Sequence, residues 1–189
     1  MILPPFAVDL CCGRGGATRA LLAAGYYVIG TDIIRHPEYP IEAAFIHGDI
    51  RELDARLFAG ALLMWASPPC QEFSRHDQPW TRAKNPPEPD MSIVDACYRI
   101  RDQAHPNFFI LENVRGAQKW LGRANFQRAG RYLWGDALLA PRVPARQKQS
   151  FPGSRPDLRA EVPFELVRSI ASMIREGVRC FGKRSSRRR

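Results

Sequence analysis

The sequence FAVDLCCGRGGATRALLAAGYYVIGTD, residues 6–32, contains the pattern that decides the fold. Its apolar run 6–10 predicts a strand, and the glycine-containing stretch 12–16 predicts a tight turn. Residues 17–24 predict a helix closed by a glycine, and residues 26–31 predict a second strand. Together they predict a βαβ unit.

Outward from this unit, strands and helices keep alternating. Further strands are predicted at residues 44–47, 61–66, 107–111 and 131–135. One helix is predicted over residues 92–103 and an amphipathic one over 163–176. The apolar face of the latter consists of Leu166, Val167, Ile170 and Ile174. The alternation predicts an α/β fold with a doubly wound, mostly parallel sheet that binds ligands at the carboxyl ends of its strands.

Two segments lack this regularity. Residues 71–89 are polar and contain four prolines, which predicts a loop. Residues 136–161 also contain four prolines and show no periodicity. Because so long an irregular connection is uncommon in a compact domain, we expect it to be functional.

The composition fits one globular domain, with 45% hydrophobic and 25% charged residues among 189. The five cysteines form no CxxC pair and there is no histidine cluster, which argues against a disulfide framework and a metal site. The N-terminus lacks the charged segment of a signal peptide, and the apolar run 58–66 is too short to cross a membrane. We expect a soluble, cytoplasmic protein without metal.

The net charge of +9 suits an anionic partner such as nucleic acid. Five of the positive charges lie in the last seven residues, 183–189. Such a basic tail is also common as a solvated chain end, so the charge alone leaves both interpretations open.

The glycine turn is the first candidate site. Gly13, Gly15 and Gly16 let the backbone approach a ligand at the start of a helix. Thr18 stands where the dinucleotide fingerprint GxGxxG needs its last glycine. Asp32 ends the second strand, where a carboxylate can accept hydrogen bonds from ribose hydroxyls. With Asp49 after the third strand, these residues indicate an adenosine-containing cofactor without a dinucleotide pyrophosphate.

The second candidate site combines a thiol with an acid. Cys70 follows two prolines just past the end of a strand, in a position that favours reactivity over packing. Arg75 or Arg115 could supply the positive charge that a thiolate needs. Glu112 follows the apolar run of the next predicted strand, where burial raises the pKa of a carboxyl group. We expect Cys70 and Glu112 to face one cleft, as a nucleophile beside a proton donor.

Three motifs in this order resemble those of DNA (cytosine-5) methyltransferases: DLCCGRGG at residues 9–16, PPCQEFS at 68–74 and LENV at 111–114. The resemblance extends from about residue 6 to 177, and the length is similar to that of short phage-encoded members. It implies the Rossmann-like sheet of S-adenosylmethionine-dependent methyltransferases. It also implies that Cys70 attacks carbon 6 of a cytosine while Glu112 engages nitrogen 3 and the exocyclic amine.

The resemblance further implies two sets of binding residues. Those implied for S-adenosylmethionine are Asp9, Gly13, Gly15, Gly16, Asp32, Asp49, Ile50 and Pro68. Those implied for DNA are Gln71, Ser74, Arg75, Asn113, Arg131, Arg142 and Arg146. No metal is implied, and a monomer is expected.

The same resemblance divides the chain into a catalytic, cofactor-binding core (1–135), a reduced recognition segment (136–161), a helix that packs back on the core (162–182) and the basic tail. Two positions depart from the family pattern. Cys11 replaces an aromatic residue near the adenine, and Ala129 replaces the first arginine of a QxRxR element. So short a recognition segment can contact one groove but reads little sequence.

Other functions stay open at this stage. An RNA cytosine methylase would use the same fold, and the altered Cys11 and Ala129 are compatible with a catalytically idle nucleic-acid-binding protein. The intact Cys70 and Glu112 argue for an enzyme. An NAD-linked oxidoreductase has the least support, because its fingerprint is incomplete.

Overall fold

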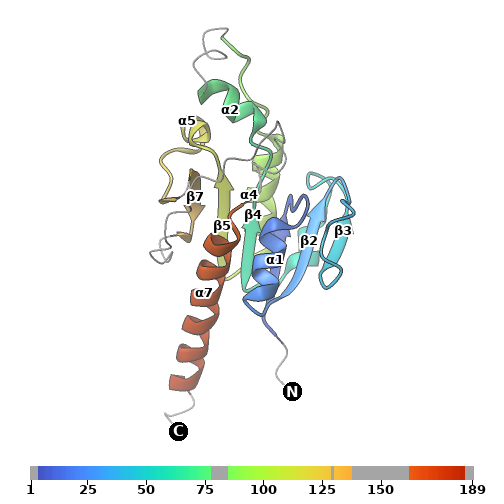
Figure 1. The fold of residues 1–189 in the computed structure, drawn as a ribbon, viewed down its shortest axis with the longest axis vertical. Coiled ribbons are helices and arrows are strands. Elements are labelled where there is room, and N and C mark those ends of the chain that lie inside the picture. Colours follow the sequence, from blue (N-terminus) through green and yellow to red (C-terminus); the bar gives the residue numbers. More distant parts are fainter. Residues whose placement is uncertain (1–3, 78–84, 129, 138–161, 186–189) are drawn as a thin grey trace.

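A computed structural model of the protein describes residues 4–77, 85–128, 130–137 and 162–185. Their strands form one seven-stranded sheet in the order β3-β2-β1-β4-β5-β7-β6 (Figure 1). The parallel strands are β1 (Phe6–Leu10), β2 (Tyr27–Asp32), β3 (Ala44–His47), β4 (Leu63–Ala66) and β5 (Phe108–Asn113). The hairpin of β6 (Phe126–Arg128) and β7 (Arg131–Gly135) completes the sheet, with β7 antiparallel to β5. The predicted doubly wound, mostly parallel sheet is thereby confirmed.

Strand β1 lies inside the sheet, between β2 and β4, and most of its residues are apolar. Ala7, Val8 and Leu10 are fully buried, as expected for a strand covered by helices on both sides. Leu10 is in register with Thr31 of β2 and with Ala66 of β4. The carboxyl ends of these strands are therefore level. The strand order reverses between β1 and β4, which makes this edge the expected ligand site.

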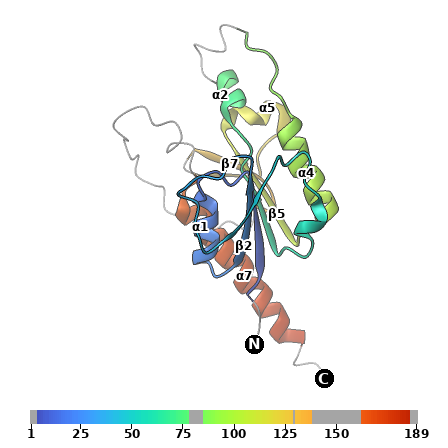
Figure 2. The same ribbon diagram turned by 90° about the vertical axis from the view of Figure 1, so that its right-hand side faces the viewer.

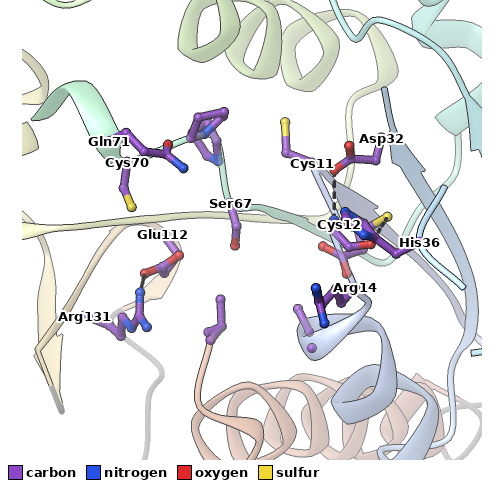
Figure 3. Close-up of a pocket in the computed structure, with 17 residues that line it drawn as sticks. Cys11, Cys12, Arg14, Asp32, His36, Ser67, Cys70, Gln71, Glu112 and Arg131 are labelled. Atoms are coloured by element: carbon purple, nitrogen blue, oxygen red, sulfur yellow. Dashed lines mark hydrogen bonds and ion pairs between the residues drawn. The ribbon is translucent and has the colours of Figure 1, made fainter. Parts of the chain in front are cut away.

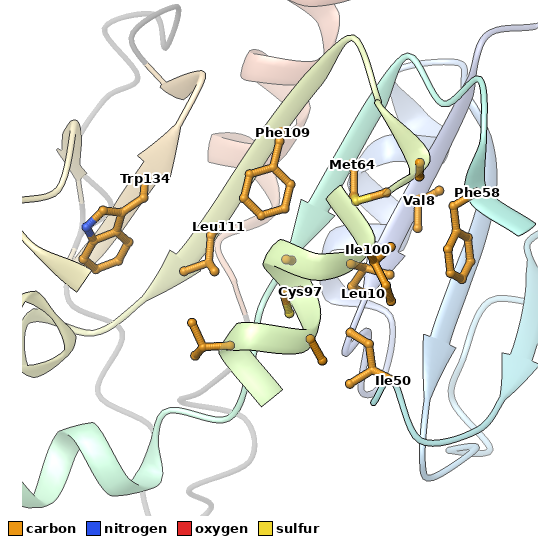
Figure 4. Close-up of a cluster of buried hydrophobic side chains, with 14 of the residues drawn as sticks. Val8, Leu10, Ile50, Phe58, Met64, Cys97, Ile100, Phe109, Leu111 and Trp134 are labelled. Carbon is orange, nitrogen blue, oxygen red and sulfur yellow. The ribbon is translucent and has the colours of Figure 1, made fainter. Parts of the chain in front are cut away.

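Helices cover both faces of the sheet (Figure 2). Helices α1 (Gly16–Ala23) and α7 (Phe164–Ser185) pack on one face. Helix α4 (Ser92–Ala104) and the 3₁₀ turn η1 (Ala55–Phe58) pack on the other, where they enclose the buried cluster of Figure 4. The four apolar residues predicted for the last helix are buried in the core, and the Tyr26 hydroxyl donates a hydrogen bond to the carbonyl of Ala171. Helix α7 continues to Ser185, well past the predicted end at Glu176.

The predicted loop over residues 71–89 is wrong at its start, because Gln71–Asp77 form helix α2. The amide and the hydroxyl of Ser74 both donate hydrogen bonds to the carbonyl of Cys70, at 2.9 Å each, which closes the first turn. Phe73 is only 2% exposed and anchors the helix to the core. The prolines that suggested a loop begin only at position 79.

Four other short elements were not predicted: the 3₁₀ turn η1, β6, the 3₁₀ turn η2 (Arg115–Ala117) and helix α5 (Gln118–Leu121). Strand β5 also includes Glu112 and Asn113, so the acid lies within the ladder instead of after it. Over the described ranges, no helix has the length and apolar character needed to span a membrane.

Candidate active site

A cavity of about 310 Å³ opens at the carboxyl ends of β1, β4 and β5 (Figure 3). Of the predicted catalytic and cofactor residues, those that line it are Asp9, Gly13, Gly16, Asp32, Pro68, Cys70 and Glu112. Gln71 and Arg131, predicted to contact DNA, line it as well. Residues from three predicted motifs thus meet in one cavity.

The glycine turn forms one wall. The Gly13 amide donates a 2.8 Å hydrogen bond to Asp32 Oδ2, and the Ile34 amide donates to Oδ1 at 3.0 Å. These bonds fix the Asp32 carboxylate while leaving lone pairs on both oxygens for a ligand. Gly13 and Gly15 have positive φ angles of 51° and 83°, a backbone conformation that favours glycine. A Cβ at Gly15 would lie 2.5 Å from Pro40 Cδ, so Gly15 supports the turn from outside the cavity.

Asp9 carries a buried carboxyl group on the same wall. It is fully buried, and Thr18 donates a 2.6 Å hydrogen bond to its Oδ2. Within the part of the chain that the structure describes, Oδ1 has no hydrogen-bond partner. Burial raises the pKa of Asp9 to about 7. A buried carboxyl oxygen without a partner is costly unless a ligand supplies one, and a cation would suit it best.

Asp49 and Ile50 are not among the residues that line the cavity. Asp49 binds the amide and guanidinium of Arg51, whose hydrogen bonds lower the pKa of Asp49 to about 2. Ile50 packs in the core beneath η1 and α4. The structure therefore places this pair at the neighbouring end of β3, outside the cavity.

Cys70 lies in the loop that follows β4, and Glu112 lies on the adjacent parallel strand β5. In Figure 3 the Cys70 sulfur points toward the Glu112 carboxylate. Asn113 is 1% exposed, and its side-chain amide donates a 3.0 Å hydrogen bond to the carbonyl of Pro68. Asn113 therefore ties the end of β5 to the loop that carries Cys70. The pairing of β4 with β5 and this bond set the position of the thiol relative to the acid.

The electrostatics of this pair depend on Arg131. Burial raises the pKa of Glu112, which is 4% exposed, while Arg131 Nη1 donates to its Oε1 at 3.3 Å and opposes that rise. Burial also raises the pKa of the Cys70 thiol, the Glu112 charge raises it further, and Arg131 lowers it. The cation that acts on Cys70 is thus Arg131, neither Arg75 nor Arg115. Arg115 pairs instead with Asp77 at 2.8 Å.

Comparison with known proteins identifies the chain. A family model described as C-5 cytosine-specific DNA methylase matches residues 7–129. The chain belongs to this family. The Type II methyltransferase M.SacI of Streptomyces achromogenes is 29% identical over 133 residues, which cover 66% of this chain and 33% of that relative. The chain therefore spans about one third of the length of the curated relative it matches.

Solved structures whose backbone resembles that of this chain include two methyltransferases. A putative DNA modification methyltransferase encoded within a prophage (E. coli) has 22% identity and a TM-score of 0.48, over 62% of this chain and 34% of the other. The Dnmt2 methyltransferase of S. pombe has 21% identity and a TM-score of 0.42, over 61% and 35%.

Some residues that this C-5 cytosine-specific DNA methylase family member brings to the cavity were not predicted: Cys12, Arg14, Ala17, His36, Ser67, Pro69 and Val162. Ser67 could have been predicted from the sequence, because it directly precedes the two prolines before Cys70. Val162 precedes α7 and reaches the cavity because that helix packs on the core. Predicted DNA contacts Ser74 and Arg75 lie on α2 outside the lining, and Arg142 and Arg146 lie outside the described residues.

Helix α2 is held beside the cavity by η2 and α5. The Phe73 and Trp120 rings lie 5.7 Å apart, and a Cβ at Gly116 would lie 2.2 Å from the Phe73 carbonyl oxygen. Gly116→Ala must therefore shift α2, which begins directly after Cys70. If the chain catalyses the methyl transfer of its family, we expect the rate of transfer to fall by about tenfold or more while cofactor affinity is retained, because small displacements of reacting groups are costly.

Steady-state transfer and calorimetric cofactor titration check this prediction. Gly177→Ala in α7, where an added Cβ meets nothing within 4 Å, is the matched control. Unchanged transfer by Gly116→Ala would show that α2 does not position the thiol.

Proposed function

We propose that this chain is a DNA (cytosine-5) methyltransferase that uses S-adenosylmethionine and a covalent cysteine adduct. The observation that carries the proposal is the convergence of Cys70, Glu112 and the glycine turn on one cavity. Membership of the C-5 cytosine-specific DNA methylase family supports the reaction class.

The cavity suits the proposed cofactor. Asp32 is placed to accept hydrogen bonds from ribose hydroxyls. The unpartnered Oδ1 of Asp9 fits an ammonium group, and the amides at the start of α1 fit a carboxylate. When bound, S-adenosylmethionine supplies a methyl group to a carbon nucleophile and leaves as a neutral thioether.

The protein's own groups make the cytosine nucleophilic. Deprotonated Sγ of Cys70 adds to carbon 6, and protonated Glu112 donates its proton to nitrogen 3. The electron pair of the 5,6 double bond then becomes available at carbon 5, which takes the methyl group. A base removes the proton from carbon 5, the Sγ–carbon 6 bond breaks to restore the double bond, and Glu112 regains its proton from nitrogen 3.

The raised pKa of Glu112 fits its role as proton donor, whereas the raised pKa of the Cys70 thiol opposes the thiolate and is only partly offset by Arg131. Burial keeps a proton on Glu112 nearer to neutral pH, where it is needed as a donor. Arg131 favours the Cys70 thiolate and lies within hydrogen-bonding distance of Glu112, so one guanidinium stabilises both charged forms. A cytosine in duplex DNA must leave the base stack to reach Cys70, at a cost of a few kcal/mol.

The remaining segments complete the proposal. Residues 1–135 bind the cofactor and the target base, and residues 136–161, with Arg142 and Arg146, contact phosphates with little sequence preference. The helix of 162–182 packs on the core, and the basic residues of 183–189 add affinity for DNA. The chain acts as a monomer in the cytoplasm.

Acceptor preference tests the proposal. The protein is incubated with methyl-labelled S-adenosylmethionine and mixed-sequence duplex DNA, single-stranded DNA or RNA. We expect label in DNA at carbon 5 of cytosine. Label in RNA alone would indicate an RNA methylase, and salt-dependent DNA retention without label would indicate an idle binding protein.

The pKa of Asp9 predicts how cofactor affinity depends on pH. In the empty protein Asp9 is largely protonated below about pH 7, so its carboxylate becomes available to an ammonium as the pH rises. Affinity for S-adenosylhomocysteine should rise roughly eightfold from pH 6 to 7.5 and then level off, because the ammonium of the ligand's free amino-acid end stays protonated over this range. Calorimetric titration across this range measures it. Asp9→Asn should bind more weakly and lose the rise, and a rise that persists in that variant would assign it to another group.

The raised pKa of Asp9 also predicts how the stability of the ligand-free protein depends on pH. The pKa of Asp9 is higher in the folded protein than its usual 3.8, so folding favours the protonated form. The stabilisation is fully present below about pH 4 and is lost as the pH rises toward 7.

A further inference from the structure

Arg14 is a wall residue of the cavity that the mechanism above does not use. It lies in the glycine turn between Gly13 and Gly15, and Figure 3 shows it beside the start of α1. Its Nη1 pairs with the exposed Glu38 carboxylate at 3.1 Å, and its side chain is 30% exposed. Such a surface ion pair contributes little free energy, so a ligand anion can compete with Glu38 or share the guanidinium with it.

The backbone holds Arg14 in place. Arg19 Nη1 donates hydrogen bonds to the carbonyl of Arg14 at 2.9 Å and to that of Glu38 at 3.2 Å. The turn and the loop that follows β2 are thereby fixed to each other. The guanidinium of Arg14 is therefore attached to a braced part of the backbone, beside the cavity.

Opposite charges lie together at this end of the cavity. Asp9 and Arg14 both line it, and Asp9 presents the unpartnered oxygen Oδ1. The first amides of α1, at Gly16 and Ala17, precede the first intrahelical bond, from the Arg19 amide to the Gly15 carbonyl. They have no partner within the helix and favour an anion. A buried acid beside a cation and amides that the helix itself leaves unpaired is complementary to an ammonium beside a carboxylate.

We propose that Arg14 binds the carboxylate of the cofactor's amino-acid end while Asp9 binds its ammonium, so that this cavity selects a zwitterionic ligand. The inference rests on the proposed use of S-adenosylmethionine. It makes Arg14 a residue that sets cofactor specificity. The other end of the cavity, at Cys70 and Glu112, is left for the base.

Two ligands distinguish carboxylate binding by Arg14 from other roles of this residue. S-adenosylhomocysteine carries the amino-acid end, and 5′-methylthioadenosine has the same adenosine and thioether without it. Arg14→Gln should weaken S-adenosylhomocysteine about tenfold, since it removes a charge-assisted bond, and change 5′-methylthioadenosine less than twofold. The loss of S-adenosylhomocysteine affinity in Arg14→Lys should be smaller than in Arg14→Gln, because lysine keeps the charge without the guanidinium fork. Arg56→Gln, which loses an exposed ion pair with Asp54 far from the cavity, is the matched control.

Each outcome of these titrations decides the inference. An equal loss for both ligands would overturn it and indicate a role in the shape of the turn. Unchanged binding of both would also overturn it, and a parallel loss of DNA retention would make Arg14 a phosphate contact. Failure of the unmodified protein to bind S-adenosylhomocysteine would reject the proposed function itself, and the inference with it. Thermal melting of each variant confirms that it is folded.

Discussion

Cys70→Ala is expected to lower methyl transfer by on the order of 10⁴-fold or more, because in the proposed mechanism the Cys70 nucleophile starts the reaction and no later step can replace it. Without Sγ nothing adds to carbon 6, and carbon 5 of cytosine stays a poor nucleophile. Affinity for S-adenosylhomocysteine should change less than twofold, since Cys70 belongs to the base end of the cavity. Transfer of labelled methyl groups to mixed-sequence DNA and calorimetric titration measure the two effects.

The control for this variant is Cys97→Ala. Cys97 is a fully buried thiol on α4 that does not line the cavity, and its loss should leave most of the transfer intact. If Cys70→Ala kept more than a tenth of the activity, the covalent mechanism would be rejected even if the protein proved to be a methyltransferase.

Glu112→Gln is expected to lower transfer by about 10²- to 10⁴-fold, the usual contribution of a positioned proton donor. Glutamine keeps the size of the side chain and cannot deliver a proton to nitrogen 3. The variant should also make Cys70 more reactive. The Glu112 charge raises the pKa of the Cys70 thiol, so removing it lowers that pKa and increases the thiolate fraction at pH 8.

Alkylation by iodoacetamide, followed on the peptide that contains Cys70, measures this second effect. A merely structural role of Glu112 would slow transfer without speeding alkylation. Glu165→Gln, which removes an exposed carboxylate paired with Arg168 on α7, should change neither rate. Slower alkylation in Glu112→Gln would mean that the two side chains do not share one electrostatic environment.

The inner parallel strands β1, β4 and β5 could be predicted because they are buried on both faces. Such strands appear as continuous apolar runs, and β1 begins and ends where the sequence predicts. The edge strand β3 also has its predicted bounds, although its residues are only partly buried or exposed. The three residues of β6 are too few and too polar to form such a run. Helix α2 was missed because the prolines farther along dominated the composition of its segment. Its own evidence is tertiary: Phe73 is buried against the core.

The candidate site was predictable where each residue sits at the end of a strand. Asp9, Asp32, Cys70 and Glu112 reach the cavity because parallel strands bring their carboxyl ends to one edge. The partner of Glu112 was not predictable in this way. Arg131 becomes its neighbour because β7 returns antiparallel beside β5, with Leu133 opposite Glu112. Strand order depends on long-range packing, so no local pattern reveals this contact.

Trapping of the covalent adduct tests the central claim most directly. Duplex DNA of mixed sequence in which 5-fluorocytosine replaces cytosine is incubated with the protein and S-adenosylmethionine, then digested and analysed by mass spectrometry. Fluorine cannot leave carbon 5 as a proton does, so the reaction should stop with Sγ still bonded to carbon 6. The account predicts a cofactor-dependent adduct at Cys70 that carries one added methyl group. An adduct at another residue, or none while ordinary DNA is methylated, would contradict it.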